Sequence, residues 1–235
     1  MPPISCGDCE LSPFTVYAPT VAAAPEKVCL QRREVRLIPQ GRTFIREGDN
    51  QQPSFILYSG WAFTYKQIQE GRRQIFSFLI PGDVVAMENF FFPSFPLPFS
   101  VKSLTQVSVC VFSVTDMAGI MRSSTEQETE FSRTMQRSVG DIHRRLIDIG
   151  RRSASGRIAQ LLLELEGRLK QRNLVHDGRF EFPVRQEHFA DALGLTTVYV
   201  NRTLVALRKR GIIAFDRHHM TILDFNELQR IAQEE

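Results

Sequence analysis

The segment from Phe131 to Ile149 constrains the fold of this chain more than any other feature of its sequence. Large apolar residues recur there at steps of four, four, three, four and three, and arginine and glutamate residues surround them. This spacing indicates one face of a long helix and is typical of a coiled-coil seam. The seam consists of Phe131, Met135, Val139, Ile142, Leu146 and Ile149. We predict that it pairs two copies of the chain; the alternative is a helix that packs on a domain of its own chain.

The residues before the seam indicate β-strands. From residue 35 to residue 113, short apolar stretches alternate with turn glycines, and many short strands at such spacing predict a sandwich or barrel. The stretches lie at 55–58, 61–65, 75–80 and 107–111, and the glycines are Gly41, Gly48, Gly60, Gly71 and Gly82. The segment 90–99 contains three prolines, which cannot donate hydrogen bonds in a central strand, so we expect an aromatic loop there.

The residues after the seam predict a second domain. The polar segment 151–156 is the expected hinge, followed by an apolar helix at 158–169, a short strand at 180–182 and two helices separated by Gly194. The C-terminal segment predicts a two-stranded wing. We therefore expect an α+β protein. Its parts are a cysteine-containing segment (1–30), a β-barrel effector domain (31–114), a long dimerisation helix (115–150) and a winged helix-turn-helix (151–235).

Residues 184–204 have the pattern of a helix-turn-helix. Gly194 permits the turn between the two helices, and Thr196 can cap the second helix. Because Val200 and Leu204 share a buried face, the opposite face near the start of this helix should point toward base edges in a DNA major groove. The candidate DNA contacts are Thr196, Thr197, Val198, Tyr199, Asn201 and Arg202, with Arg208 and Lys209 as candidate phosphate contacts.

Side-chain chemistry and charge both favour DNA as the ligand. Arginine can form two hydrogen bonds with guanine, and asparagine can do the same with adenine. The net charge of +3 comes entirely from residues 151–235, because residues 1–150 carry 15 basic and 15 acidic side chains. No acidic residue lies between Asp191 and Asp216, whereas four basic residues do. Such a basic stripe is typical of proteins that bind the phosphate backbone.

Other classes of protein fit the sequence less well. No apolar run reaches the roughly 18 residues of a membrane span, and the N-terminus lacks the segments of a secretory signal, so we expect a cytoplasmic location. The five histidines have no metal-ligand spacing. Nucleophile motifs and glycine-rich phosphate loops are also absent from the sequence. We therefore do not expect an enzyme.

Two segments resemble a known family. Residues 71–83, from Gly-Arg-Arg-Gln-Ile to Pro-Gly-Asp, resemble the effector-domain core of the CRP/FNR superfamily of bacterial regulators, and residues 191–204 resemble its helix-turn-helix. The order of parts is similar along essentially the whole chain, most of all to the FNR/FixK-like branch. The resemblance implies a cyclic-nucleotide-binding-like jelly roll, a homodimer, a palindromic double-stranded DNA operator and RNA polymerase as a partner, with no membrane.

The positions that bind cyclic nucleotides in relatives differ in this chain. Met87 stands where those relatives have a glutamate for the ribose, and the position of their phosphate-binding arginine falls near Phe99. Between Arg73 and Arg122, the single cationic residue is Lys102. A buried phosphate without a guanidinium partner is strongly disfavoured, so we do not expect cyclic AMP as the effector.

Four cysteines form the candidate sensor. Cys6, Cys9 and Cys110 resemble ligands of the iron–sulfur cluster of FNR-type oxygen sensors, which implies a [4Fe–4S] cluster with Cys29 as the fourth ligand. Those sensors place the third cysteine a few residues after the pair, whereas here a flexible segment, 10–28, separates Cys9 from Cys29. Cys110 should face away from its valine neighbours, toward the N-terminal segment, because strand side chains alternate.

Alternatives to the cluster stay open at the level of sequence. Cys29 and Cys110 can be small buried hydrophobic residues beside a lone Cys-x-x-Cys redox or metal motif. The chain would then be a cofactor-free regulator of the same family, controlled by its abundance or by an unknown small ligand in the barrel. A barrel cavity filled by the 90–99 loop would favour control by abundance.

Overall fold

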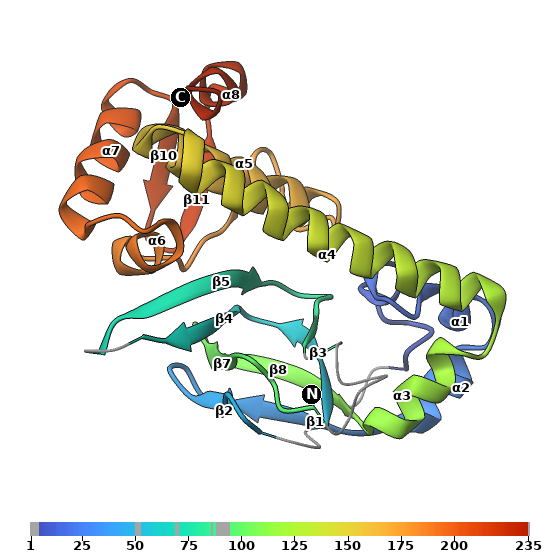
Figure 1. The fold of residues 1–235 in the computed structure, drawn as a ribbon. Helices are drawn as coiled ribbons and strands as arrows, with labels where there is room; N and C mark the ends of the chain where they lie inside the picture. The colour runs from blue at the N-terminus through green and yellow to red at the C-terminus, as the bar shows by residue number, and fades with distance from the viewer. Residues whose placement is uncertain (1–4, 50–52, 69–70, 86, 88–94, 235) are drawn as a thin grey trace. The chain divides into compact units, whose positions relative to one another are not determined.

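A computed structural model describes residues 5–49, 53–68, 71–85, 87 and 95–234. The chain divides into two compact units (Figure 1). The first contains Met1–Lys66 and Phe76–Val139, and the second contains Gln67–Ile75 and Gly140–Glu235. Within the described residues, no helix is both long enough and apolar enough to cross a membrane.

Two four-stranded sheets form the centre of the first unit. One has the order β1 (Arg32–Ile38), β8 (Val107–Phe112), β3 (Ser54–Ser59) and β6 (Val84–Val85). The other has the order β2 (Thr43–Ile45), β7 (Ser100–Ser103), β4 (Ala62–Gln67) and β5 (Arg73–Leu79). In the described residues the sheets form a jelly-roll-like sandwich and do not join into the closed barrel that the strand spacing also allowed.

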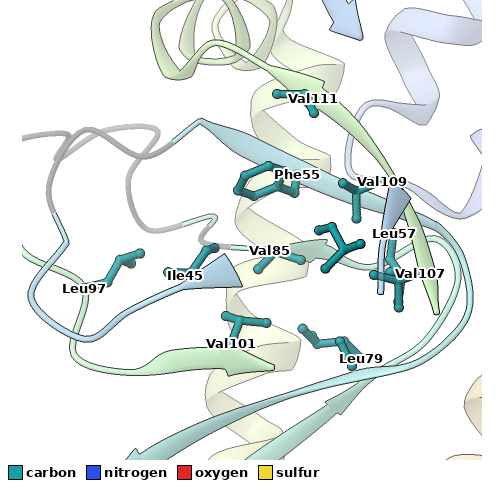
Figure 2. Close-up of a cluster of buried hydrophobic side chains, with 12 residues drawn as sticks. Ile45, Phe55, Leu57, Leu79, Val85, Leu97, Val101, Val107, Val109 and Val111 are labelled. Atoms are coloured by element: carbon teal, nitrogen blue, oxygen red, sulfur yellow. The ribbon is translucent and has the colours of Figure 1, made fainter. Parts of the chain in front are cut away.

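The inner faces of both sheets share one apolar core (Figure 2). Val107, Val109 and Val111 point into it from β8, because alternate residues of a strand face the same side. Leu97 is buried in the core and Phe99 packs against it. Residues 90–94 of the predicted aromatic loop lie outside the described part of the chain, and residues 95–99 form no helix or strand.

Short helices surround a second apolar cluster of the same unit. They are η1 (Ser12–Phe14), α1 (Ala18–Ala23), α2 (Pro25–Gln31) and α3 (Val114–Met121), and Figure 1 shows the last three near the start of α4. We expected the segment 10–28 to be flexible enough to return Cys29 to the cysteine pair; Cys29 does lie near Cys6, and the segment between them contains the first two of these helices and the start of α2. Each of the first three helices has a proline in its first two positions, where the missing N–H costs no helical hydrogen bond.

Helix α4 (Thr125–Arg151) is the long helix that the seam predicted. It is followed in the second unit by α5 (Ala154–Lys170), α6 (Gln186–Leu193) and α7 (Thr197–Lys209). The predicted wing is the antiparallel pair of β10 (Ile213–Asp216) and β11 (His219–Ile222). Its sheet also contains β9 (Arg179–Glu181), so the wing has a third strand, and α8 (Phe225–Ala232) ends the chain.

Candidate nucleic-acid interface and cysteine site

Helices α6 and α7 form the helix-turn-helix around Gly194. Gly194 has a φ of +65°, a left-handed conformation that glycine adopts without strain, and it ends α6. The Thr196 side chain accepts a hydrogen bond from the backbone N–H of Tyr199 at 3.2 Å and caps α7. At the start of α6, buried His188 accepts a hydrogen bond on Nδ1 from the N–H of Arg185 at 3.0 Å. Local contacts therefore fix the start of α6, its end at Gly194 and the start of α7.

Helix α7 has one buried and one exposed face. Val200, Leu204 and Leu207 are buried, as the apolar spacing predicts. The opposite face near the N-terminus is solvent-exposed and includes Val198, of which 77% is exposed. Of the candidate DNA contacts, Tyr199 is half-buried, and the others are exposed: Thr196, Thr197, Val198, Asn201, Arg202, Arg208 and Lys209.

Two neighbours hold the polar side chains of this face. Gln186 Nε2 donates to Asn201 Oδ1 at 2.9 Å, and the Arg202 guanidinium lies 4.9 Å from the centre of the Tyr199 ring. Sequence reasoning missed Gln186, whose position at the first residue of α6 carries no signal until the two helices are placed together. These contacts restrict the rotamers of Asn201 and Arg202 before any ligand arrives.

The cations at the end of α7 differ in their availability. Arg210 forms an ion pair with Glu227 of α8. No ion pair engages Arg208 or Lys209 within the part of the chain that the structure describes, and both are exposed. The interface therefore has polar groups near the start of α7 and cations near its end.

The seam of α4 divides into two parts. Phe131 and Met135 are partly buried because they pack against the second apolar cluster of their own unit. The later seam residues are exposed to solvent, with exposed fractions of 46% for Val139, 61% for Ile142 and 64% for Leu146. Ile149 is 36% exposed. Packing within one chain thus covers the apolar residues at the start of the seam. The residues of its second half stay exposed in a single copy of the protein.

Gln127 connects the N-terminal segment to α4. It is completely buried, and its Oε1 accepts a hydrogen bond from Thr20 Oγ1 at 2.7 Å. Its Nε2 donates to the backbone carbonyl of Val16 at 2.6 Å. The segment that carries three of the four cysteines is therefore bonded to the first turn of the helix that carries the seam.

A cavity of about 420 Å³ lies between the N-terminal segment and the outer face of the first sheet. Cys110 pairs with Val35 of β1 and Ile56 of β3, so these three side chains share that outer face, opposite the core valines. The other residues that line the cavity include Cys6, Cys9, Tyr17, Arg32 and Tyr58. The predicted direction of Cys110, toward the N-terminal segment, agrees with this arrangement.

Cys29 lies beside Cys6, which its distance in the sequence did not reveal. Cys29 packs against the apolar cluster in which Cys6 is buried, and burial together with the neighbouring Cys29 raises the pKa of Cys6 to about 12. Arg32 Nη2 donates to Cys29 Sγ at 3.9 Å, and the Arg32 charge also acts on Cys110. Burial raises the pKa of Cys110, against the influence of Arg32.

Cysteine thiolates are the usual ligands of iron–sulfur clusters, so the four residues have suitable chemistry. Their positions, however, are not those of four ligands around one cluster. All four are free thiols in one region of the first unit. In the described residues, no three or more histidine, cysteine, aspartate or glutamate side chains are grouped so that they could hold a metal ion. The thiols would therefore have to move closer together before they could share one cluster.

Comparison with known families gives two matches. A Crp-like helix-turn-helix domain matches residues 156–231, and a cyclic nucleotide-binding domain matches residues 35–124. The second match includes the positions of Met87 and Phe99.

Similar proteins extend over nearly the whole chain. The transcriptional activator protein anr of Pseudomonas aeruginosa is 23% identical and covers 99% of this chain and 94% of its own length. The nitrogen fixation regulation protein FixK of Bradyrhizobium diazoefficiens is 27% identical, with coverages of 97% and 93%. The transcriptional activator protein FnrL of Cereibacter sphaeroides is 26% identical, with coverages of 95% and 90%. Among solved structures, FixK2 from Bradyrhizobium japonicum has the same fold, with a TM-score of 0.74 at 21% identity over 86% of this chain and 98% of that one.

Proposed function

Because the chain belongs to the CRP/FNR superfamily and is a DNA-binding transcription regulator rather than an enzyme, we propose that it acts as a homodimer on a palindromic operator and responds to oxygen or redox conditions through its N-terminal cysteines. The observation that carries the DNA-binding part is the exposed face at the start of α7. Asn201 and Arg202 lie there side by side, and each has a neighbour that restricts its rotamers.

The two-fold symmetry of the proposed operator follows from the seam. Val139, Ile142 and Leu146 form an exposed apolar stripe on α4, and a second copy of the same helix would cover it. An isologous pair of helices presents two identical recognition helices, which require two inverted half-sites. In the cytoplasm such a dimer would act on transcription together with RNA polymerase.

The cysteine site is the proposed sensor. Cys6, Cys9, Cys29 and Cys110 are the residues that would hold a [4Fe–4S] cluster, since the chain has four cysteines and they gather on one unit. When bound, such a cluster supplies oxygen-sensitive redox chemistry. Gln127 would transmit a change at the cysteine site to α4, because this residue hydrogen-bonds the cysteine-bearing segment to that helix.

A cofactor-free regulator is the second candidate, and the filled core favours it over a regulator with a ligand inside the sandwich. Leu97 is buried among the core residues, and Phe99 packs against them near the position of the family's phosphate-binding arginine. Met87 is also buried and apolar, where a ribose would need an acceptor. The side chains described at these positions are therefore apolar and do not supply the polar partners that cyclic AMP needs.

Two measurements test the proposal separately. Selection from random DNA with the full chain should return an inverted repeat, and Arg230→Ala on α8 should select the same sequence as the wild type. A sequence without symmetry would contradict binding as a two-fold dimer. Purification without oxygen, followed by an iron assay and a visible spectrum, tests the sensor. Colourless, iron-free protein that binds its operator tightly would exclude the cluster and leave the DNA-binding function intact.

A further inference from the structure

The turn that contains Cys6 packs directly on helix α2. A Cβ atom added to Gly7 would lie 3.2 Å from Cβ of Pro25, the first residue of α2, which is closer than ordinary carbon contacts. Cys29 follows Pro25 by four residues on the same helix, and residues at this spacing share one helix face. The close approach at Gly7 therefore brings the Cys6 turn onto the face that carries Cys29, and Cys29 packs against the apolar cluster in which Cys6 is buried.

The two thiols differ in access. Cys6 is buried, with 7% of its surface exposed, whereas Cys29 is half-buried. The Arg32 guanidinium supplies positive charge beside the Cys29 sulfur, at 3.9 Å. Reactive cysteines are accessible sulfur atoms in electropositive surroundings, and oxidation-sensitive ones often have a second thiol within reach. Cys29 has the first property, and Cys6 is the second thiol.

We propose that Cys29 and Cys6 form a peroxide-reactive thiol pair, in which a hydroperoxide oxidises Cys29 and Cys6 closes a disulfide with it. In the first step the Cys29 sulfur attacks the peroxide, so that an S–O bond forms while the O–O bond breaks, and water or an alcohol leaves. In the second step the Cys6 sulfur attacks the sulfenic acid. An S–S bond forms, the S–O bond breaks, and the hydroxide leaves with the Cys6 proton as water.

The net change balances without any metal. The two thiols lose two protons and two electrons, and the peroxide takes up both and is reduced to water or to an alcohol and water. The two sulfur atoms must come within about 2.05 Å of each other to form the disulfide, which requires a movement of the Cys6 turn along α2. The inference goes beyond the proposed function because this reaction needs no iron, and it stands whether or not the same thiols also hold a cluster.

The tryptic peptides of the chain separate the competing pairs. Cys6 and Cys9 lie together in peptide 1–27, Cys29 lies in peptide 28–32, and Cys110 lies in peptide 103–122. The full chain would be reduced, freed of iron with a chelator, treated with hydrogen peroxide and digested without reductant. We expect a species that joins 1–27 to 28–32, lighter by two hydrogen atoms than the two peptides together, and its loss after dithiothreitol treatment.

Matched variants identify which two sulfur atoms form the disulfide. Cys9→Ser and Cys110→Ser should keep the joined peptide, whereas Cys6→Ser and Cys29→Ser should lose it. In Cys6→Ser the Cys29 sulfenic acid has no resolving thiol, so a 1,3-dicarbonyl reagent that traps sulfenic acids should label peptide 28–32 much more than in the wild type. This label also shows that the variant remains reactive.

Three results would overturn the proposal. One is a bridge within peptide 1–27, which would assign the redox pair to Cys6 and Cys9. Another is a joined peptide that persists in Cys6→Ser and disappears in Cys9→Ser, which would assign Cys9 as the partner of Cys29. The third is irreversible oxidation of Cys29 in the wild type without any bridge. Because the protein is iron-free in every arm, none of these results depends on the cluster.

Discussion

Arg202 and Lys209 lie on the same helix but should contribute to binding in different ways. Arg202 is exposed near the start of α7, where it can form two hydrogen bonds with guanine, so Arg202→Ala should cost about 1 to 3 kcal/mol of discrimination at one base pair of each half-site. Lys209→Ala should weaken binding to all sequences alike and reduce the salt dependence, as expected for a phosphate contact. Competition binding against single-base operator variants distinguishes them. Equal losses on every sequence for both variants would contradict a base contact by Arg202.

His188 should make the DNA-binding unit sensitive to acid. Its burial lowers the pKa to about 4 from the usual 6.5, so below pH 6.5 the unfolded chain takes up a proton that the folded chain does not. The stability of this unit should therefore fall as pH falls from about 6.5 to about 4, by about 2 to 4 kcal/mol, and then level off. Urea unfolding followed by circular dichroism at several pH values measures the slope.

The first unit provides an internal control for this titration. Trp61, the one tryptophan of the chain, lies there and is buried, so its fluorescence follows that unit. His188→Asn keeps an acceptor near the Arg185 N–H and removes the titrating ring, and its second-unit transition should lose most of the acid slope. An unchanged slope in this variant would assign the acid sensitivity to other groups.

At the scale of elements, the sequence predicted those that have a recognisable apolar pattern, either short apolar stretches between turn glycines or apolar residues at helical spacing. The strands of the sandwich, the seam helix and the helix pair around Gly194 have this property. The short helices η1, α1 and α2 do not, because each has only three to seven residues, and α1 and α2 pack into the second cluster through Val21 and Val28. The same packing brings Cys29 to Cys6, which is why no spacing rule could place Cys29.

The two halves of the seam should respond differently to substitution. Ile142→Glu would place a charge in the covered interface of a dimer, where an unpaired buried charge costs about 3 to 5 kcal/mol, so this variant should be monomeric and bind its operator weakly. Ile147→Glu is the matched control, because Ile147 is 58% exposed but lies outside the seam repeat. Light scattering and operator binding measure both effects. A dimeric Ile142→Glu protein would contradict dimerisation through the seam.

At the scale of the whole molecule, the sequence predicted the order of the parts but not the link between the sensor and the dimer helix. The link is a buried glutamine, and nothing in a sequence distinguishes Gln127 from an exposed glutamine of the same helix such as Gln136. Its partners, Val16 and Thr20, lie more than a hundred residues away, so only the folded chain identifies them. The link matters because α4 continues from this first turn to Arg151, through both units.

Gln127→Leu tests whether this link carries the signal. Leucine has a similar size and no polar atoms, so the Val16 carbonyl and the Thr20 hydroxyl lose their partner, at about 1 to 3 kcal/mol of stability of the first unit. If the thiols act on the operator through α4, the ratio of operator dissociation constants between peroxide-treated and reduced protein should differ from one in the wild type, by about 5- to 150-fold for typical coupling. It should approach one in Gln127→Leu, while Gln136→Leu should keep the wild-type ratio. Because the ratio compares two states of the same folded variant, a general loss of stability would not mimic uncoupling. A Gln127→Leu protein with the wild-type ratio would show that the signal travels by another route, such as the contacts of Phe131 and Met135 with the second cluster.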